Sequence, residues 1–128
     1  MANSWETPKK NTILILDSDK KQREEMCALL LRENYLANAI AATADLEQTL
    51  SEGNPLAVIL DIDTVDIDNR RIRDLTIKYP GIIILCVSKH RFHPKLRDAI
   101  YYHVFACLNR PIDPEELFYF LKSLGNDT

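Results

Sequence analysis

The chain has 128 residues, of which 46% are hydrophobic and 27% charged, and its formal net charge is −3. This length and composition are typical of one globular domain with an ordinary core and argue against global disorder. The slightly acidic balance argues against a basic nucleic-acid surface, and no apolar run approaches the roughly 20 residues that cross a bilayer. Residues 1–10 lack an apolar signal core, so we expect a cytoplasmic protein.

Short apolar runs alternate with amphipathic segments along the chain. The apolar runs are residues 13–16, 35–41, 56–60, 82–87 and 104–108. The first, third and fourth runs are rich in β-branched residues and show no polar alternation, which indicates strands covered on both faces. Helices are predicted between and after the runs, starting near residues that can form an N-cap region: Asp19, Thr43, Asp68, His93 and Asp113.

This alternation predicts an α/β fold. Right-handed crossovers between successive strands give an open parallel sheet with helices on both faces. We assign residues 11–124 to this domain, residues 1–10 to a flexible N-terminal tail, and residues 125–128 to a C-terminal tail or the start of a linker.

The cysteine content favours a reducing compartment. Cys27, Cys86 and Cys107 show no C-x-x-C spacing, and each lies in an apolar context. An odd number of such residues favours reduced core thiols over a redox role.

Polar residues stand where the predicted strands end: Asp17, Ser18 and Asp19 after the first, Asp61 and Asp63 after the third, Ser88 after the fourth, and Arg110 after the fifth. In open α/β sheets, ligands bind at the carboxyl ends of the strands. Crowded carboxylates repel one another, and Mg²⁺ would relieve that repulsion because it prefers oxygen ligands. A phosphoryl group could then sit on one carboxylate, neutralised by the metal, the hydroxyl group and the cation.

In order and spacing, the segments ILILDSD, VILDIDTVDIDN, IIILCVS and CLNRP, followed by DPEEL, resemble the receiver (CheY-like) domain of two-component response regulators. The resemblance covers about residues 11–124. It implies a flavodoxin-like, doubly wound five-stranded parallel sheet with strand order 2-1-3-4-5. It also implies a role in phosphorelay signal transduction that is not enzymatic: a sensor histidine kinase or phosphotransfer protein phosphorylates the domain, which then switches a partner-binding surface.

The resemblance also implies a role for each matching residue. Asp61 would be the phosphoacceptor, and Ser88 would contact the phosphoryl group. Asp17, Asp61 and the backbone carbonyl of Asp63 would hold Mg²⁺. Arg110 stands where the family has lysine, and the peptide bond that follows it, before a proline, is typically cis. The surface of the fourth helix, last strand and last helix would serve a homodimer or an output partner.

Several positions depart from the family pattern. Ser18 replaces the second of two adjacent acids, which predicts weak Mg²⁺ binding unless Ser18 or Asp19 contributes indirectly. Arginine and lysine are not interchangeable, because the guanidinium is wider and planar. Cys107, Val65 and Asn69 replace the usual aromatic residue, proline and glycine. The alternatives are therefore phosphorylation, weak or short-lived phosphorylation, or a pseudo-receiver that acts as a phosphorylation-independent interaction module.

Two further interpretations remain. Residues 61–65 fit the D-x-D-x-[TV] motif of haloacid-dehalogenase-like phosphatases, but residues 1–60 precede the motif and the later strand ends carry no acidic pair. Alternatively, the fold is a common one with no chemistry at this edge. In that case acids such as Asp19, Asp68 and Asp113 only cap helices, which is our preferred interpretation of these three.

Overall fold

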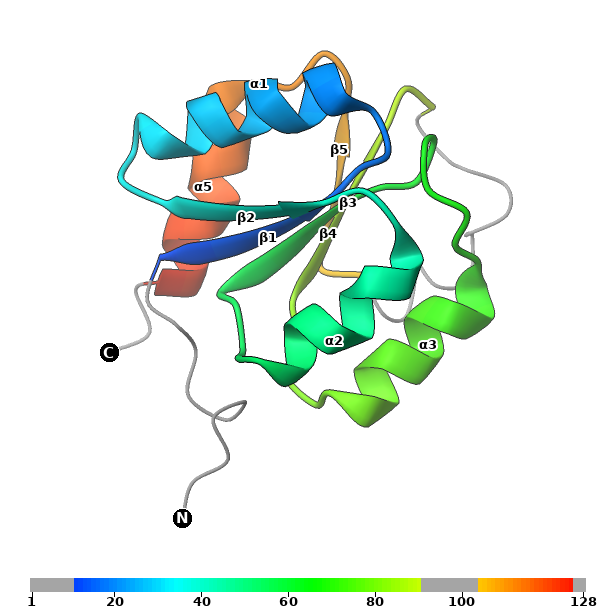
Figure 1. Cartoon of the computed structure of the whole chain (residues 1–128). Helices are drawn as coiled ribbons and strands as arrows, with labels where there is room; N and C mark the ends of the chain where they lie inside the picture. The colour runs from blue at the N-terminus through cyan, green and yellow to red at the C-terminus, as the bar shows by residue number, and fades with distance from the viewer. Residues whose placement is uncertain (1–10, 91–103, 126–128) are drawn as a thin grey trace.

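The computed structural model describes residues 11–90 and 104–125 (Figure 1). In these residues the strands are β1 (Thr12–Leu16), β2 (Leu36–Ile40), β3 (Ala57–Asp61), β4 (Ile84–Ser88) and β5 (Ala106–Asn109). They form one five-stranded sheet in the order β2-β1-β3-β4-β5, and every neighbouring pair is parallel. The predicted doubly wound sheet and its strand order are confirmed.

Helices cover both faces of this sheet. They are α1 (Lys20–Leu31), α2 (Leu46–Ser51), α3 (Asn69–Lys78) and α5 (Pro114–Gly125), with a 3-10 turn, η1 (Thr43–Asp45), before α2. Helices α1 and α5 lie on one face, and α2 and α3 lie on the other (Figure 1). The helix predicted to start at His93, and the segments 1–10 and 126–128, lie outside the described residues.

The core is divided into two layers by the sheet. Side chains alternate along a strand, so Ile13 and Ile15 of β1 pack with α1 and α5, whereas Leu14 and Leu16 pack with α2 and α3. All residues of β3 and β4 are buried. The continuous apolar runs therefore do form strands covered on both faces, as predicted.

Helix capping agrees with the sequence at three of the four predicted positions in the described residues, among them Asp113, which accepts a hydrogen bond from the Glu115 amide at 3.0 Å. Asp19 accepts a hydrogen bond from the Gln22 amide at 2.9 Å, and Asp68 accepts one from the Arg71 amide at 2.9 Å. The prediction that Thr43 caps a helix is wrong, because η1 starts at this residue and shows no side-chain cap. The short 3-10 turn takes the place of the first turn of the expected helix.

The prediction that all three cysteines are core thiols is wrong for Cys107, which is exposed, while Cys86 is buried and Cys27 is intermediate. Cys107 lies on β5, the edge strand, which has a neighbouring strand on one side only. The register places it directly beside Cys86 of β4.

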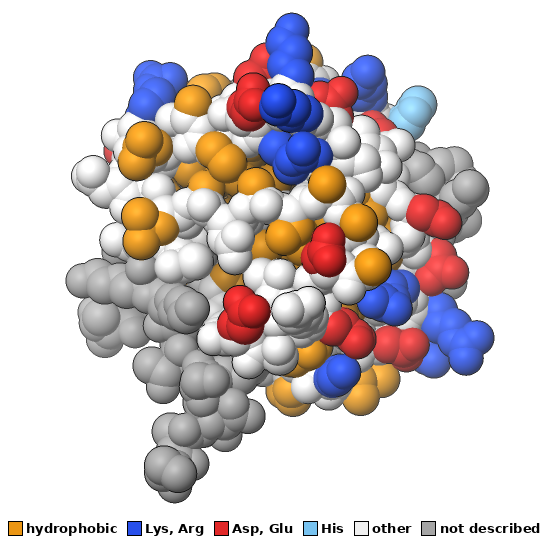
Figure 2. Space-filling model, in the orientation of Figure 1, with side chains coloured by type: hydrophobic (Ala, Val, Ile, Leu, Met, Phe, Trp, Pro, Cys, Tyr) orange, Lys and Arg blue, Asp and Glu red, His pale blue; other side chains and the backbone are white. Residues whose placement is uncertain are grey.

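The opposite edge of the sheet carries exposed apolar residues. The side chain of Leu36 on β2 is 63% exposed, and Leu31 at the end of α1 is similarly exposed. Figure 2 shows hydrophobic side chains across the middle of this face of the molecule, with charged side chains above and below them. None of the described helices is long and apolar enough to span a membrane.

Candidate functional site

Four predicted site residues lie at the carboxyl edge of the sheet because of the strand order. Asp17 follows β1, Asp61 ends β3, Ser88 ends β4 and Arg110 follows β5. These four strands are consecutive neighbours, so their ends meet along one edge. The Arg110 amide donates to the Ser88 carbonyl at 2.9 Å, which fixes the end of β5 against the end of β4.

Arg110 bridges two buried carboxylates. Asp17 and Asp61 are each 2% exposed, and the Arg110 side chain is 17% exposed. The Arg110 Nη2 lies 2.8 Å from Asp61 Oδ2 and 3.2 Å from Asp17 Oδ2, and Nε donates to Asp61 Oδ2 at 3.0 Å. The guanidinium therefore offsets the repulsion between two like charges that burial would otherwise make unfavourable.

Neutral donors complete the shell around Asp17. The Thr64 hydroxyl donates to Asp17 Oδ1 at 2.9 Å, and the Asp19 amide donates to the same oxygen at 2.8 Å. The Gln22 amide group lies 3.3 Å from Asp17 Oδ2 and 3.5 Å from Asp61 Oδ2. Both oxygens of Asp17 are thus hydrogen-bonded, as a buried carboxylate requires.

Sequence reasoning missed Gln22 and Thr64 as members of this site. Gln22 lies in the first turn of α1, three residues after its N-cap, and Thr64 lies three residues after Asp61. Their closeness in sequence to the two acids was a usable signal. The contact of Thr64 with Asp17, however, joins residues 47 positions apart and follows from the pairing of β1 with β3.

The two oxygens of Asp61 have different surroundings. Oδ1 accepts hydrogen bonds from the backbone amides of Asp63 at 2.9 Å and Thr64 at 3.0 Å. Oδ2 faces the Arg110 side chain. The backbone thus fixes the carboxylate orientation, and Oδ2 is the oxygen held by a side chain.

The hydroxyl group of Ser88 hydrogen-bonds to Asp63 rather than to Asp61. Its hydroxyl donates to Asp63 Oδ1 at 2.8 Å, and the Lys89 amide donates to Asp63 Oδ2 at 2.6 Å. The His90 amide donates to the Ser88 hydroxyl at 2.9 Å. The edge therefore holds a second cluster, formed by Asp63, Ser88 and Lys89, beside the buried one.

The oxygen atoms at this edge that could ligate a metal ion are not arranged to bind Mg²⁺. The Ser18 hydroxyl donates to the Ala41 carbonyl at 2.9 Å, and Asp19 caps α1, so neither adds an oxygen to the pair Asp17 and Asp61. Within residues 11–90 and 104–125, no group of three or more acidic, histidine or cysteine side chains could hold a metal ion. The point where the two Oδ2 atoms converge is taken by the guanidinium of Arg110.

The peptide bond between Arg110 and Pro111 is cis, as the resemblance implied. Beside it lies an open cavity of about 500 Å³, which is lined by Gln22, Met26, Arg110 and Ile112 among others. This cavity brings solvent to the outer side of Arg110.

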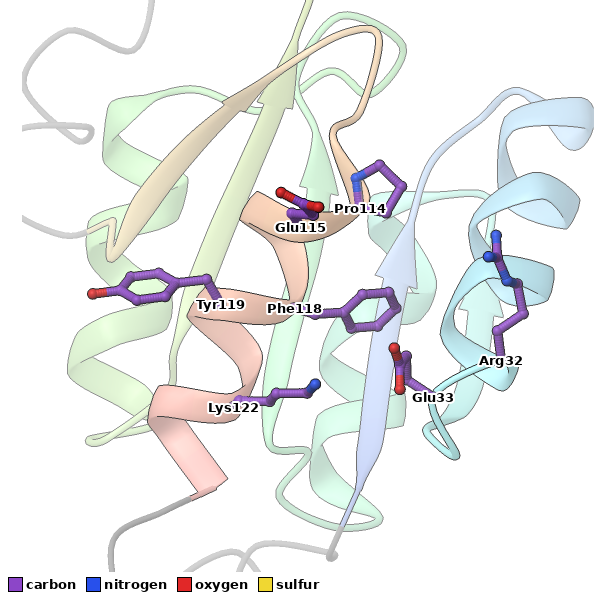
Figure 3. Close-up of a pocket in the computed structure, with 7 residues that line it drawn as sticks. All are labelled: Arg32, Glu33, Pro114, Glu115, Phe118, Tyr119 and Lys122. Carbon is purple, nitrogen blue, oxygen red and sulfur yellow. The ribbon is translucent and has the colours of Figure 1, made fainter.

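A separate pocket of about 360 Å³ lies between the end of α1 and α5 (Figure 3). Phe118 and Tyr119 line it together with charged side chains such as Arg32 and Lys122. The pocket contains none of the site residues described above. We assign it no part in the chemistry of the sheet edge.

The fold is shared with many solved structures. A signal receiver domain of an HD domain-containing protein from Pseudomonas fluorescens Pf-5 matches with a TM-score of 0.78 and 19% identity, over 89% of this chain and 85% of that one. A CheY-like receiver domain from Methylobacillus flagellatus matches with a TM-score of 0.77 and 20% identity, over 88% and 97%. The chain has the receiver-domain fold.

A third match is the beryllofluoride-activated NtrC4 receiver domain dimer, with a TM-score of 0.79 and 18% identity, over 91% of this chain and 98% of that one. No family model and no curated protein matches the sequence. At these identities the comparisons establish the receiver fold, and the roles of individual residues in this receiver fold stay predictions.

Proposed function

We propose that this receiver domain acts in phosphorelay signal transduction, with Asp61 as the phosphoacceptor. One observation carries the proposal: Asp61, Asp17, Ser88 and Arg110 meet at the carboxyl edge of a receiver-type sheet, where ligands of this fold class bind. The four residues follow four different strand ends, and together they bring a nucleophile, a hydroxyl group and a cation to one edge.

The residues support the following transfer. Oδ2 of Asp61 attacks the phosphorus of a phosphohistidine, the P–N bond breaks, and the electron pair leaves with the donor imidazole. Arg110 releases Oδ2 and turns toward the phosphoryl oxygens, where its charge offsets theirs. Backbone amides keep Oδ1 in place throughout. Any later hydrolysis acts on the domain itself, so the domain is a switch and not an enzyme.

A phosphorylation-independent interaction module is the second candidate function. The specific observation in its favour is that Arg110 already neutralises both buried acids, and that Ser18 turns its hydroxyl toward a backbone carbonyl. In that case the edge is a structural ion cluster, and the domain signals through its surface alone.

The partners follow from the same proposal. A sensor histidine kinase or phosphotransfer protein would dock at the edge that holds Asp61. A homodimer or output partner would use the fourth helix, β5 and α5, of which the fourth helix lies outside the described residues. Phe105, directly before β5, and Tyr119 on α5 are exposed aromatic side chains that would suit such contacts. We place this exchange in the cytoplasm.

Intact mass spectrometry after incubation with acetyl phosphate tests the proposal. We expect a base-labile adduct of one phosphoryl group that is lost in Asp61→Asn and kept in Asp66→Asn, which removes a nearby exposed carboxylate. Parallel reactions with and without Mg²⁺ measure how far the adduct depends on the ion.

Failure of the adduct to form, together with no spectral response to beryllofluoride, would favour the interaction module. A pull-down with an Asp61→Asn variant would then retain the partner. Loss of the partner in that variant would instead show that Asp61 is required.

A further inference from the structure

Two donors at the end of β4 converge on one carboxylate. The Ser88 hydroxyl lies 2.8 Å from Asp63 Oδ1, and the Lys89 amide lies 2.6 Å from Asp63 Oδ2. A hydroxyl group and a backbone amide side by side form a small anion-binding pair, because both direct hydrogen atoms at the same negative group. Asp63 fills this pair with one oxygen for each donor.

The donor side of this contact is fixed. Ser88 is 5% exposed and ends a fully buried strand. Its hydroxyl accepts from the His90 amide, and its carbonyl accepts from the Arg110 amide. Asn109 donates to the carbonyl of His90 at 3.1 Å, which ties the turn after β4 to the end of β5.

The acceptor side is open to solvent. Asp63 is exposed, although its carboxylate accepts both hydrogen bonds. Water can therefore compete for this carboxylate far more easily than for Asp61, which is 2% exposed. A second anion that reached Ser88 and Lys89 would compete with Asp63 for both donors.

Asp63 is also placed beside the phosphoacceptor by the backbone. Its own amide donates to Asp61 Oδ1 at 2.9 Å, so the two carboxylates belong to one tight turn. A phosphoryl group on Asp61 would add negative charge next to Asp63 and present new acceptor oxygens near the same donors.

We infer that Asp63 is an internal anion that binds the Ser88 hydroxyl and the Lys89 amide in the unmodified protein. These hydrogen bonds fix the conformation of the turn after β4 without phosphorylation. Asp63 regulates the site: a phosphoryl group on Asp61 gains Ser88 and Lys89 only by displacing Asp63. This competition rests on the proposed function, whereas the hold on the two donors does not.

NMR of the unmodified protein tests the hold. In Asp63→Ala, the Lys89 amide proton loses its charged acceptor, so we expect its resonance to move to lower frequency and its hydrogen exchange to become at least several-fold faster. Asp66→Ala removes an exposed carboxylate from the same loop and serves as the matched control, with the Lys89 amide unchanged. Equal urea midpoints for the two variants would show that both are folded.

An unchanged Lys89 resonance and exchange rate in Asp63→Ala would overturn the inference. A shift of the same size in Asp66→Ala would also overturn it, because that result would assign the effect to general charge.

The rate of adduct formation with acetyl phosphate tests the competition. We expect Asp63→Ala to react several-fold faster than the unmodified sequence and Asp66→Ala to react at the original rate. Equal rates in all three would refute competition by Asp63. If no protein forms an adduct while the Lys89 amide responds as expected, the proposed phosphorylation fails and the hold by Asp63 stands.

Discussion

Two charged clusters lie side by side at the carboxyl edge of the sheet, and they differ mainly in exposure. Asp17, Asp61 and Arg110 form a buried group in which the carboxylates are almost inaccessible. Asp63, two residues after Asp61, is exposed and accepts hydrogen bonds from the buried Ser88 hydroxyl and the Lys89 amide. Similar hydrogen-bond lengths therefore represent different energies, since burial removes the competition from water.

The two clusters are expected to differ in how easily their hydrogen bonds break. Breaking the buried group leaves uncompensated charge in the interior, so the protein is expected to resist it. Breaking the hydrogen bonds to Asp63 replaces them with water, so a competing anion can do it. Under the proposed function, the buried group would position the phosphoacceptor oxygen and the exposed carboxylate of Asp63 would respond to the change.

Removal of Arg110 gives the largest expected effect. In Arg110→Met, Asp17 and Asp61 stay buried without a cation, and we expect the free energy of unfolding to fall by about 3–5 kcal/mol. Urea denaturation followed by circular dichroism measures it. The exposed Arg73→Met is the control and should change stability by less than about 0.5 kcal/mol. A loss as small as that of the control would show that the buried group is not an ion cluster.

Removal of the Thr64 hydroxyl should have the next largest effect. Thr64→Val keeps the shape but removes the donor to Asp17 and the acceptor of the Ser18 amide, so we expect a loss of about 1–3 kcal/mol. Thr49→Val, at an exposed helical hydroxyl group, is the matched control in the same denaturation experiment. Equal effects in the two variants would contradict a structural role for Thr64 at the site.

Replacement of Ser18 by the acid that is usual in the receiver pattern should raise the affinity of this edge for Mg²⁺. In Ser18→Asp a third carboxylate joins the edge, so we expect Mg²⁺ to bind more tightly by on the order of tenfold. Isothermal titration calorimetry measures the affinity, with Ser51→Asp as a control on an exposed helix end. Unchanged affinity would contradict the prediction that Ser18 weakens Mg²⁺ binding.

The smallest expected effect concerns the pair of Cys86, which is buried, and Cys107, which is exposed. A hydrogen bond from Cys86 lowers the pKa of the Cys107 thiol, while the same bond and burial raise the pKa of Cys86. A lower pKa leaves more thiolate at pH 7, and thiolate is the form that reacts. We expect iodoacetamide to modify Cys107 before Cys86.

Cys86→Ala removes the hydrogen bond, so alkylation of Cys107 at pH 7 should slow several-fold. Cys86→Ser keeps a donor and should preserve most of the rate. Peptide mass spectrometry locates the modified thiol. Faster alkylation of Cys107 in Cys86→Ala would reverse the expected sign and exclude this hydrogen bond as the cause.

Much of the fold could be predicted because local sequence and global packing agree. Runs such as 56–60 and 82–87 have no polar alternation, and only a strand covered on both faces buries them fully. Asp19 and Asp68 cap their helices through hydrogen bonds that span three residues, so the sequence alone indicates them. Thr43 was predicted wrongly because a 3-10 turn and an N-cap have similar local sequences.

The sequence by itself determined the α/β fold and the sheet edge that would carry polar side chains, since strand ends and helix caps depend on neighbours in the chain. Only the tertiary structure decided which of these side chains touch. Arg110 meets Asp17 across 93 positions, and Ser88 meets Asp63 across 25. Such contacts follow from strand order, register and side-chain direction, which are set by the packing of the whole sheet.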